Sequence, residues 1–564
     1  MHADTLSGRA ALAQAFALQQ SGRLDEAEAA YANVLASDPA NAAALTNAGA
    51  LALARSDVAV AVARFQRATE LAPKQALAYN NLGFALIRAG RDAEALAELE
   101  RAVTLQPDYA QAHNNRGIAL VRLARRAEAI QAFERALAIE PSYTEAAINL
   151  GEQANRDGQP ARAAAAFDRA LVCQPENIHA KTGRAFSLAL TGDLAQARRS
   201  LERVVATHPN AANAWQALGA VLNWTWQHEA AEAAFRRVVE LDAGNADPQF
   251  GIASTLLARG QFDDGWAAFE RRPDAGRDRG IAFAQIPAWD GSFLEGTLVV
   301  YGEQGFGDVV QFARFLKAAR DRVGGLLLLL DNYHAPLGPL LAQAAGVDRV
   351  INNCQALPTA TVAARVSLMS LPHRLRITGE SIRGTPRYLS PPADRRASWR
   401  PRLAPLGRPR VGIAWSVFAR DDQRFVTQHK SVPAEILMPL VAMREASFVT
   451  LQPGAAGDPS PFASRVFDVR AELADFGDTA ALIDELDLII TADTAVAHIA
   501  GALGKPVWML DRFNTCWRWR LAADTSPWYP TLRIFRQDRF GDWSGPAKRL
   551  REAFAAWVAA PRPE

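Results

Sequence analysis

The chain has 564 residues, more than one hydrophobic core usually accommodates, so two or more domains are expected. Hydrophobic residues make up 49% and charged residues 22%, which is ordinary for a packed globular protein. The 62 basic and 60 acidic residues leave a formal net charge of +2, which gives no reason to expect a nucleic-acid partner.

Three cysteines lie far apart, at Cys173, Cys354 and Cys516. An odd number without C-x-x-C spacing favours a reducing compartment. The N-terminus has no basic stretch followed by an apolar segment, so no secretory signal is expected. The most apolar run, residues 324–330, is too short to cross a bilayer and is predicted to be a buried strand. We therefore expect a cytoplasmic protein without a transmembrane segment.

The N-terminal half repeats with a period of 34 residues. Six prolines mark the period, each 34 residues after the one before: Pro39, Pro73, Pro107, Pro141, Pro175 and Pro209. An alanine stands twelve residues before each proline and a bulky apolar residue eight before it, as Ala61 and Phe65 stand before Pro73. Glycine recurs twelve residues before the alanine in several units: Gly49, Gly83, Gly117 and Gly151.

This pattern predicts stacked pairs of antiparallel helices and resembles the tetratricopeptide repeat. Small residues let the helices approach closely, and the bulky residue fills the space between units. Proline ends the second helix because it lacks an amide hydrogen and clashes with the preceding turn. A seventh unit fits with Gly219, Ala231 and Phe235, and a degenerate eighth, ending near Trp266 and Phe269, is expected to cap the array.

Tetratricopeptide arrays present a concave face to extended peptides or partner proteins, so the resemblance implies a protein or peptide partner. A spacer or dimerisation element without a specific ligand is the alternative. Asparagine on the first helix of a unit faces the groove in this repeat family and holds peptide backbone. The resemblance therefore implies a peptide groove with four asparagines: Asn80, Asn81, Asn114 and Asn115.

From about residue 280, short β-rich runs alternate with helical stretches, which indicates parallel sheets built from βαβ units. Seven runs are predicted to be strands: 298–301, 326–330, 366–368, 411–415, 448–451, 488–491 and 507–510. Residues 391–410 are rich in proline and arginine without an apolar period, so we expect a linker there between two α/β lobes. Such lobes bind ligands at the carboxyl ends of their strands.

The first motif with candidate chemistry is YGEQGFGD, residues 301–308, leading into a helix predicted from residue 309. Its glycines permit a tight turn and a close approach of substrate to backbone amides. Gln304, Gly305 and Gly307 are therefore candidates for an acceptor-side turn. Asp308 is a candidate general base for an acceptor hydroxyl, or else an ordinary helix cap.

The second motif is LIITADTAVAHIAGALGKPVWML, residues 488–510, in which Asp493 and Thr494 stand between a strand and a helix. The first free amides of that helix and the Thr494 hydroxyl are predicted to face an anion, and the diphosphate of a nucleotide sugar fits there. His498 lies on the first turn of the helix, and either faces the cleft or is a packed or capping residue.

The third motif follows the strand at 411–415 with a polar loop through residues 420–428 and ends at Lys430 and Ser431. Such a loop is a suitable phosphate clamp, because lysine supplies a compact positive charge. A solvated basic loop is the alternative. No carboxylate cluster with clear metal spacing is present in the sequence, so no metal and no cofactor beyond a nucleotide-sugar co-substrate is expected.

Together the three motifs resemble the glycosyltransferase family that includes the lipopolysaccharide heptosyltransferases, which has the two-lobed GT-B fold. The resemblance is greater still to bacterial proteins in which such a domain follows tetratricopeptide repeats. It covers about residues 286–550 and rests on six segments: GEQGFGDVVQFARF (302–315), SLMSLPHRL (367–375), VGIAWS (411–416), FVTLQPG (448–454), DFGDTAALIDELDLIITADTAVAHIAGALGKPVWML (475–510) and WRWRLAADTSPWYPTLRIFRQ (517–537).

The resemblance implies roles for single residues. The acceptor-activating aspartate of the family falls on Asp308. The turn that binds the donor diphosphate falls on Asp493 and Thr494, with His498 in the matching helix, and a phosphate-contacting lysine falls near Lys430. The sequence departs from heptosyltransferases at Ala495, where they usually have glycine, and in its aromatic tail, so the donor need not be an ADP-heptose.

These observations predict an α-solenoid of tetratricopeptide repeats followed by an α/β GT-B fold of two Rossmann-like lobes. The expected domains are a solenoid at 1–275, an acceptor-side lobe at 286–392 and a donor-side lobe at 408–555. The predicted activity is metal-independent, inverting transfer of a hexosyl or heptosyl group from a nucleotide-diphosphate sugar to a hydroxyl acceptor. The acceptor is a protein, glycan or glycolipid, recruited directly or through a partner by the repeats. The alternatives are a non-catalytic scaffold with a degenerate nucleotide- or glycan-binding domain, and an epimerase-class lobe pair.

Overall fold

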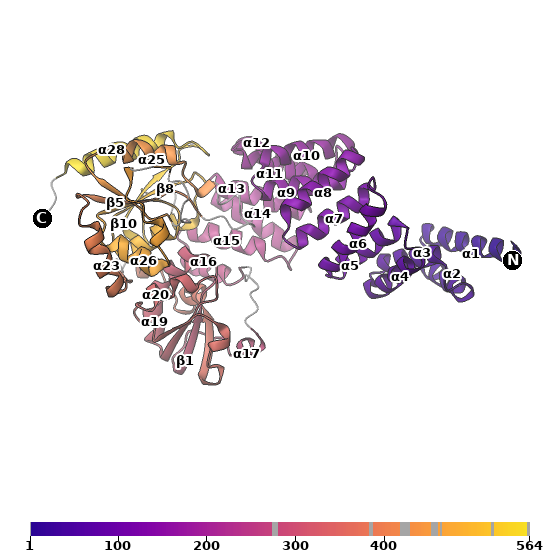
Figure 1. The fold of residues 1–564 in the computed structure, drawn as a ribbon, viewed down its shortest axis with the longest axis horizontal. Helices are drawn as coiled ribbons and strands as arrows, with labels where there is room; N and C mark the ends of the chain where they lie inside the picture. The colour runs from indigo at the N-terminus through magenta and orange to yellow at the C-terminus, as the bar shows by residue number, and fades with distance from the viewer. Residues whose placement is uncertain are drawn as a thin grey trace. The chain divides into compact units, whose positions relative to one another are not determined.

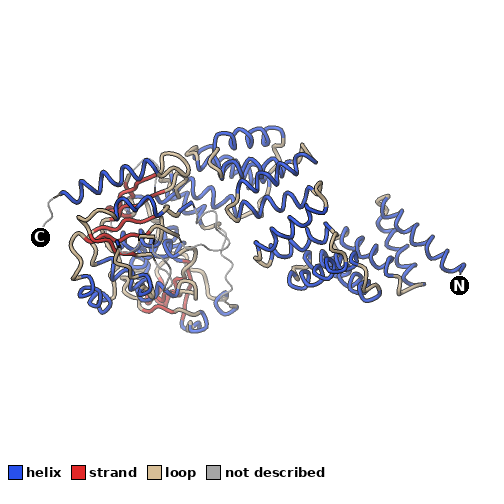
Figure 2. The backbone as a smooth tube through the Cα atoms, turned by 45° about the horizontal axis from the view of Figure 1, so that its top comes forward, coloured by secondary structure: helices blue, strands red, loops and turns tan. Residues whose placement is uncertain are grey.

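The structure is a computed structural model that describes residues 2–272, 280–382, 387–417, 429–452, 461–462, 465–519 and 524–560. Its contacts group the chain into two compact units, Met1–Ser200 and Leu201–Glu564. Helices fill the N-terminal part, and the strands drawn in Figure 2 belong to the C-terminal part. Within the described residues, no helix is both long enough and apolar enough to cross a membrane.

The helices of the first unit form antiparallel pairs, which confirms the predicted solenoid (Figure 1). The twelve helices to residue 207 are α1 (His2–Gln20), α2 (Leu24–Ser37), α3 (Ala42–Ala54), α4 (Val58–Leu71), α5 (Ala76–Arg88), α6 (Asp92–Leu105), α7 (Ala110–Arg122), α8 (Arg126–Ile139), α9 (Thr144–Arg156), α10 (Pro160–Cys173), α11 (Ile178–Leu190) and α12 (Leu194–Thr207). The second helix of each pair ends two residues before a repeat proline, as α4 ends before Pro73.

The repeat glycines allow the two helices of a unit to touch. A Cβ atom at Gly117 would lie 2.5 Å from Phe133 Cε1, and one at Gly49 would lie 2.7 Å from Phe65 Cε1. Both rings are only 1% exposed, so the surrounding core leaves them no space to move aside. Glycine at this position is therefore required by the aromatic residue sixteen positions later.

The second unit begins with two more helix pairs. These are α13 (Ala212–Trp224) with α14 (His228–Leu241), and α15 (Asp247–Ala258) with α16 (Phe262–Phe269). The predicted role of α16 as a cap is wrong, because its aromatic face does not end the apolar packing. The Trp266 ring packs against Phe312, Trp517 and Trp528 at centroid distances of 5.9, 5.7 and 6.4 Å. Large buried rings need a partner surface, and here the α/β region supplies it.

The N-terminal lobe contains a parallel sheet of four strands in the order β3-β2-β1-β4. Its elements are α17 (Ile281–Ala284), β1 (Leu294–Tyr301), α18 (Phe306–Phe312), α19 (Leu316–Arg320), β2 (Val323–Leu329), α20 (Gly338–Leu341), β3 (Arg349–Ile351), β4 (Val362–Ser367), α21 (Leu371–Arg374) and α22 (Gly379–Ile382). The three strands predicted here are confirmed. The short β3 was not predicted, because three residues show no period.

The C-terminal lobe contains six strands in the order β6-β5-β7-β8-β10-β9, all parallel except β9. Its elements are β5 (Arg410–Ala414), α25 (Ala434–Val441), β6 (Ser447–Thr450), α26 (Phe476–Asp484), β7 (Leu488–Ala492), α27 (Ala495–Ala502), β8 (Val507–Asp511), β9 (Thr525–Ser526), β10 (Tyr529–Arg536) and α28 (Ser544–Ala559). The four strands predicted here are confirmed, and the aromatic tail adds β9 and β10.

The predicted linker at residues 391–410 is wrong, because this segment forms α23 (Ala393–Leu403). Trp399 and Leu403 lie one helical turn apart and are buried at 3% and 0% exposure, where the helix packs against α26. Its arginines pair with acidic residues around α26, as Arg396 Nε does with Glu485 Oε1 at 2.7 Å. Two apolar positions and paired arginines stabilise this helix without a visible apolar period.

In each lobe the order of the strands reverses beside the first strand. In the N-terminal lobe, β2 lies on one side of β1 and β4 on the other; in the C-terminal lobe, β6 and β7 flank β5 in the same way. Loops that follow strands on the two sides of such a point diverge and leave a ligand site at the carboxyl ends. The first predicted motif follows β1, the third follows β5 and the second follows β7.

Candidate functional site

The turn after β1 enters α18 three residues earlier than predicted. Gly305 caps the helix, so Asp308 lies within its first turn and is not the N-cap residue itself. Asp308 Oδ2 accepts a hydrogen bond from the Gly305 amide at 2.9 Å. Gln304 adopts a φ of 66°, a strained conformation for a residue with a side chain. One carboxylate oxygen of Asp308 is thus used to close its own turn.

A buried histidine supports this turn from the other side. His334 Nε2 lies 3.1 Å from the carbonyl oxygen of Gln304, and His334 Nδ1 lies 2.8 Å from Asp331 Oδ1. The His334 side chain is fully buried. The strained backbone at Gln304 is therefore held by a specific contact, which the sequence analysis did not predict.

The turn after β7 positions a second carboxylate at the start of α27. Asp493 Oδ2 lies 2.9 Å from Lys430 Nζ, and Trp519 Nε1 donates to Asp493 Oδ1 at 3.0 Å. Thr494 caps α27, its hydroxyl accepting a hydrogen bond from the Val496 amide at 3.2 Å. Two predicted motifs, one after β5 and one after β7, therefore meet at the point where the strand order reverses.

The environment of Asp493 keeps its carboxyl group ionised. Burial is the largest single influence and by itself would raise the pKa of Asp493, but the charge and hydrogen bond of Lys430, together with further neighbours that include Arg512, hold that pKa well below its usual range. Because Asp493 is only 6% exposed, this pair is a charge site built into the interior of the lobe.

His498 is a packed residue at the contact between the lobes. A Cβ atom at Gly307 would lie 2.6 Å from His498 Cδ2, so glycine at this position allows α18 to approach α27. His498 Nδ1 lies 2.9 Å from the Tyr529 hydroxyl oxygen. Burial lowers the pKa of His498 to about 4, opposed by the negative charge of Asp493, so the ring is neutral at pH 7.

Arg518 joins the two candidate carboxylates electrostatically. Its Nη2 forms an ion pair with Asp308 Oδ1, and its Nε donates to Gln311 Oε1 at 2.6 Å. The guanidinium also lies over the Trp517 ring, 4.3 Å from its centroid, and interacts with the charge of Asp493. The sequence analysis missed Arg518, although it stands in the quoted aromatic tail.

The third predicted motif is described by the structure only in part. Ser431 accepts a hydrogen bond from the Val417 amide at 3.1 Å and so closes the loop after β5. The polar loop at 420–428 lies outside the described residues. Within the described residues, no group of three or more acidic, histidine or cysteine side chains is arranged to hold a metal ion.

Three of the four groove asparagines bond to one another. Asn115 Nδ2 donates to Asn80 Oδ1 at 2.9 Å between successive units, and Asn80 Nδ2 donates to Asn81 Oδ1 at 3.3 Å. A second bond between successive units completes this ladder, where Asn149 Nδ2 donates to Asn114 Oδ1 at 3.0 Å. Asn80, Asn114 and Asn115 are at most 5% exposed, so a bound peptide must displace part of this ladder to reach them.

The arrangement brings together most of the residues predicted for transfer chemistry. His498 interacts electrostatically with both carboxylates, Asp308 and Asp493. The cations of the site are Lys430, paired with Asp493, and Arg518, paired with Asp308. Each carboxylate has its own cation, so the site holds balanced charges until a ligand arrives. Such a site can bind an anion with its cations and accept a proton on a carboxylate.

Family models match both parts of the chain. Two models described as tetratricopeptide repeats match residues 74–142 and residues 12–63, 114–178 and 191–246. A model described as glycosyltransferase family 9 (heptosyltransferase) matches residues 469–526. The matched C-terminal segment includes Asp493, His498 and Arg518.

Protein FlbA of Caulobacter vibrioides is 29% identical over 345 residues. The match spans 55% of this chain and 55% of that protein, so the chain covers about half the length of this curated relative. Two solved structures are similar to parts of the chain. A tetratricopeptide repeat protein from Parabacteroides merdae ATCC 43184 covers 44% of this chain and 99% of its own, with 19% identity and a TM-score of 0.38. A thermophilic tetratricopeptide repeat protein from Thermus thermophilus covers 32% of this chain and 99% of its own, with 24% identity and a TM-score of 0.29.

The repeat matches coincide with the helix pairs, and the family 9 match coincides with the Asp493 turn and the aromatic tail. The chain therefore combines tetratricopeptide repeats with a C-terminal segment that matches the model of glycosyltransferase family 9.

Proposed function

We propose that the α/β region transfers a sugar from a nucleotide-diphosphate donor to a hydroxyl group of an acceptor. The observation that carries the proposal is the Lys430–Asp493 pair at the strand reversal of the C-terminal lobe, together with Arg518, which pairs with Asp308 of the N-terminal lobe and also interacts with the charge of Asp493. The family 9 match over residues 469–526, which includes Asp493 and Arg518, supports it.

The donor diphosphate binds at the start of α27, in this proposal. Lys430 and the positive end of the α27 helix dipole supply positive potential where the leaving group gains negative charge. Asp493 holds the lysine in place, because its ionised carboxylate fixes the position of Nζ. His498 stays neutral and contributes packing, since a buried imidazole with a pKa of about 4 carries no charge at pH 7.

Transfer follows from one displacement. The acceptor oxygen forms a bond to the anomeric carbon, the bond from that carbon to the diphosphate oxygen breaks, and the diphosphate leaves with the electron pair. Asp308 takes the proton from the acceptor hydroxyl. Its Oδ1 is bound to Arg518, so the acceptor replaces Arg518 there, and the freed guanidinium turns to the diphosphate.

The acceptor side of the proposal rests on the repeats. Tetratricopeptide units form surfaces for proteins and peptides, so we propose that they recruit a protein acceptor or a partner that delivers a glycan or glycolipid. Cys173, Cys354 and Cys516 are all free thiols, which favours a reducing compartment and hence the cytoplasm.

Binding and turnover of a panel of nucleotide diphosphates and nucleotide sugars test the proposal. We expect Asp493→Ala to abolish nucleotide binding, and Asp308→Ala to bind the same nucleotide while turnover falls about 100-fold or more. Asp290→Ala, at an exposed carboxylate on the loop before β1, is the control and should change neither. Donor hydrolysis without added acceptor gives a readout that does not require the acceptor to be known.

The outcomes separate the alternatives. If no nucleotide binds to the wild-type protein, the transferase proposal fails, and a repeat scaffold takes its place. If a nucleotide binds but neither transfer nor hydrolysis occurs with any sugar, the domain is a nucleotide-binding module. Equal turnover in the wild type and in Asp308→Ala would remove Asp308 from the proposed mechanism.

A further inference from the structure

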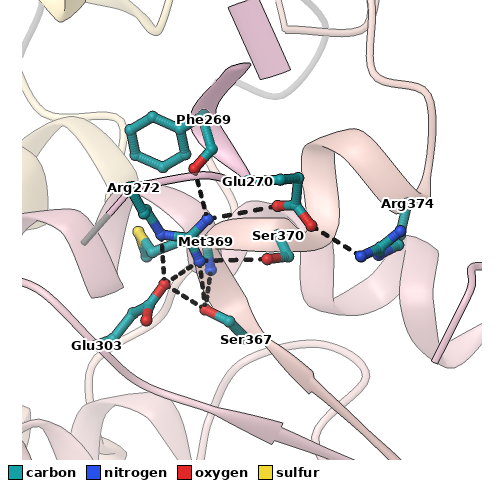
Figure 3. Close-up of polar contacts among 8 residues, drawn as sticks. All are labelled: Phe269, Glu270, Arg272, Glu303, Ser367, Met369, Ser370 and Arg374. Carbon is teal, nitrogen blue, oxygen red and sulfur yellow. Dashed lines mark hydrogen bonds and ion pairs between the residues drawn. The ribbon is translucent and has the colours of Figure 1, made fainter. Parts of the chain in front are cut away.

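A buried polar network links the end of α16 to the N-terminal lobe (Figure 3). Arg272 lies just beyond α16, and its side chain is 6% exposed. It donates from Nε to Glu303 Oε1 at 2.7 Å and from Nη1 to the Phe269 carbonyl oxygen at 2.9 Å. Its Nη2 also pairs with Glu303 and donates to Ser367 Oγ at 3.1 Å.

The network gathers the chain at the N-terminal-lobe strand reversal. Glu303 follows β1 in the turn that carries Asp308, and Ser367 ends β4 on the other side of the reversal. Ser367 Oγ donates to Glu303 Oε1 at 2.6 Å, and Ser370 Oγ accepts from Arg272 Nη2 at 3.2 Å. One guanidinium therefore fixes the relative position of three segments that are distant in sequence.

The choice of charged groups here is not explained by stability alone. A buried ion pair gives little net stability, because removing both charges from water offsets most of their attraction, and apolar residues of similar volume would stabilise the fold as well. A planar guanidinium with several fixed donors does what apolar residues cannot, because it sets the direction of each partner. Figure 3 shows Glu303 and the two serines directed at the one guanidinium group.

We infer that Arg272 is a positioning residue, which acts through Glu303 to hold the turn at residues 302–308, and with it Asp308, in register with α16. The last helical repeat thereby sets the orientation of the acceptor-side carboxylate. The inference rests on the proposed function only for its effect on turnover. Its structural part, the hold on the turn, stands independently of any activity.

The test compares Arg272→Met and Arg272→Lys with a control, Arg374→Met. Arg374 belongs to the same network, where its Nη2 donates to Glu270 Oε2 at 2.8 Å, but it does not bond to Glu303 (Figure 3). The first readout is hydrogen–deuterium exchange of full-length protein. In Arg272→Met, we expect amides of residues 302–309 to exchange about tenfold faster or more, with residues 488–500 unchanged. Arg374→Met should leave both segments as in the wild type.

The second readout is steady-state transfer. Misplacement of a general base lowers kcat by about 100-fold in Arg272→Met, while the KM for the donor stays within about twofold of the wild type. Arg272→Lys should recover part of kcat, because lysine restores the positive charge but not the planar set of hydrogen-bond donors of the guanidinium group. A merely structural role would instead reduce kcat in proportion to the folded fraction and give no recovery beyond restored folding.

Glu303→Gln keeps the inference testable if Arg272→Met does not fold, because glutamine has the same shape and loses only the charge. Faster exchange at residues 302–309 in Glu303→Gln supports the inference, and unchanged exchange there overturns it. If the wild type transfers no sugar, the proposed function fails while the exchange result still decides whether Arg272 holds the turn. Normal kcat together with a loosened turn overturns the catalytic part.

Discussion

Lys430 Nζ lies 2.9 Å from Asp493 Oδ2 and joins the loops that follow β5 and β7. These are the two strands between which the order of the C-terminal sheet reverses. The carboxylate is almost completely buried, whereas the lysine side chain is 25% exposed. The lysine therefore keeps part of its side chain accessible while a buried carboxylate fixes its position, an arrangement suited to an anionic ligand.

Replacing this lysine tests how much the fold depends on the pair. We expect Lys430→Met to lower the free energy of unfolding by about 3 kcal/mol, because Asp493 stays buried without its cation. Nucleotide binding should be lost in the same variant. All 13 tryptophans lie after residue 200, so tryptophan fluorescence during urea unfolding follows the second unit alone.

Lys317→Met is the matched control, because Lys317 forms an exposed ion pair with Asp321 on the same unit, with side chains 61% and 58% exposed. It should change the free energy of unfolding by at most about 0.5 kcal/mol. Equal unfolding midpoints for the two methionine variants would contradict the buried-pair interpretation.

His498 predicts a pH dependence of stability with a defined direction. Burial lowers the pKa of His498 to about 4, although the negative charge of Asp493 acts to raise it. In the unfolded chain a histidine has a pKa of about 6.5. Between these two values the unfolded chain binds a proton that the folded chain does not. Stability therefore falls as the pH decreases through this window, by about 2 kcal/mol between pH 8 and pH 5.

The measurement is the free energy of unfolding of the second unit at both pH values, in the wild type and in His498→Gln. The variant lacks the titrating ring, so the loss between pH 8 and pH 5 should be smaller than in the wild type by about 2 kcal/mol. Other histidines titrate equally in both proteins and cancel in the comparison. Equal pH dependence in the two proteins would show that His498 does not titrate as its burial implies.

The period of the repeats and the alternation of the strands could be predicted from the sequence because both are local patterns. Each repeat proline fixes a helix end, and each long apolar run fixes a strand. Local patterns did not predict the helix in residues 391–410, because α23 is stabilised by arginines that pair with acidic residues around α26, more than 70 positions away. Helix α16 was mistaken for a cap because the partners of Trp266 also lie far along the chain.

The residues of the candidate site also fall into two groups, those predicted from the sequence and those found only in the structure. Asp308, Lys430 and Asp493 stand in the segments that follow β1, β5 and β7, and this position was the reason to predict them as site residues. Arg518, His334 and Arg272 stand in no glycine-rich or repeated pattern, and their contacts form only when distant segments meet. The strained φ of Gln304 left no signal, because a glutamine in a glycine-rich turn has no sequence mark.

The asparagine ladder predicts a stability effect in the first unit. Asn115→Ala leaves Asn80 Oδ1 buried without the donor now 2.9 Å away, so the unit should lose about 1–3 kcal/mol. Far-ultraviolet circular dichroism reports the helices of both units, whereas tryptophan fluorescence reports the second unit alone, so a transition seen only by circular dichroism belongs to the first unit. The exposed Asn33→Ala on α2 is the control and should unfold as the wild type does. Unaltered unfolding of Asn115→Ala would mean that the ladder does not stabilise the array and that its amides are free for a peptide.

Gly307 offers the most direct test of the contact between α18 and α27. A Cβ atom there would lie 2.6 Å from His498 Cδ2, and the ring cannot retreat because it packs against Trp519 and Tyr529. We expect Gly307→Ala to destabilise the second unit by about 1–3 kcal/mol and to lower turnover, because the turn that carries Asp308 must shift. Both effects are measured by tryptophan-detected unfolding and by steady-state transfer.

The control for this change is Gly302→Ala in the same turn. A Cβ atom at Gly302 would meet its nearest neighbour, Leu330 Cδ2, at 3.4 Å, an ordinary contact distance. Gly302→Ala should therefore remain within about 0.5 kcal/mol of the wild type. If both alanine variants behave alike, the contact between Gly307 and His498 does not set the spacing of the two helices. A loss confined to Gly307→Ala assigns that spacing to the absence of a side chain at this one position, because the same substitution five residues earlier meets no comparable obstacle.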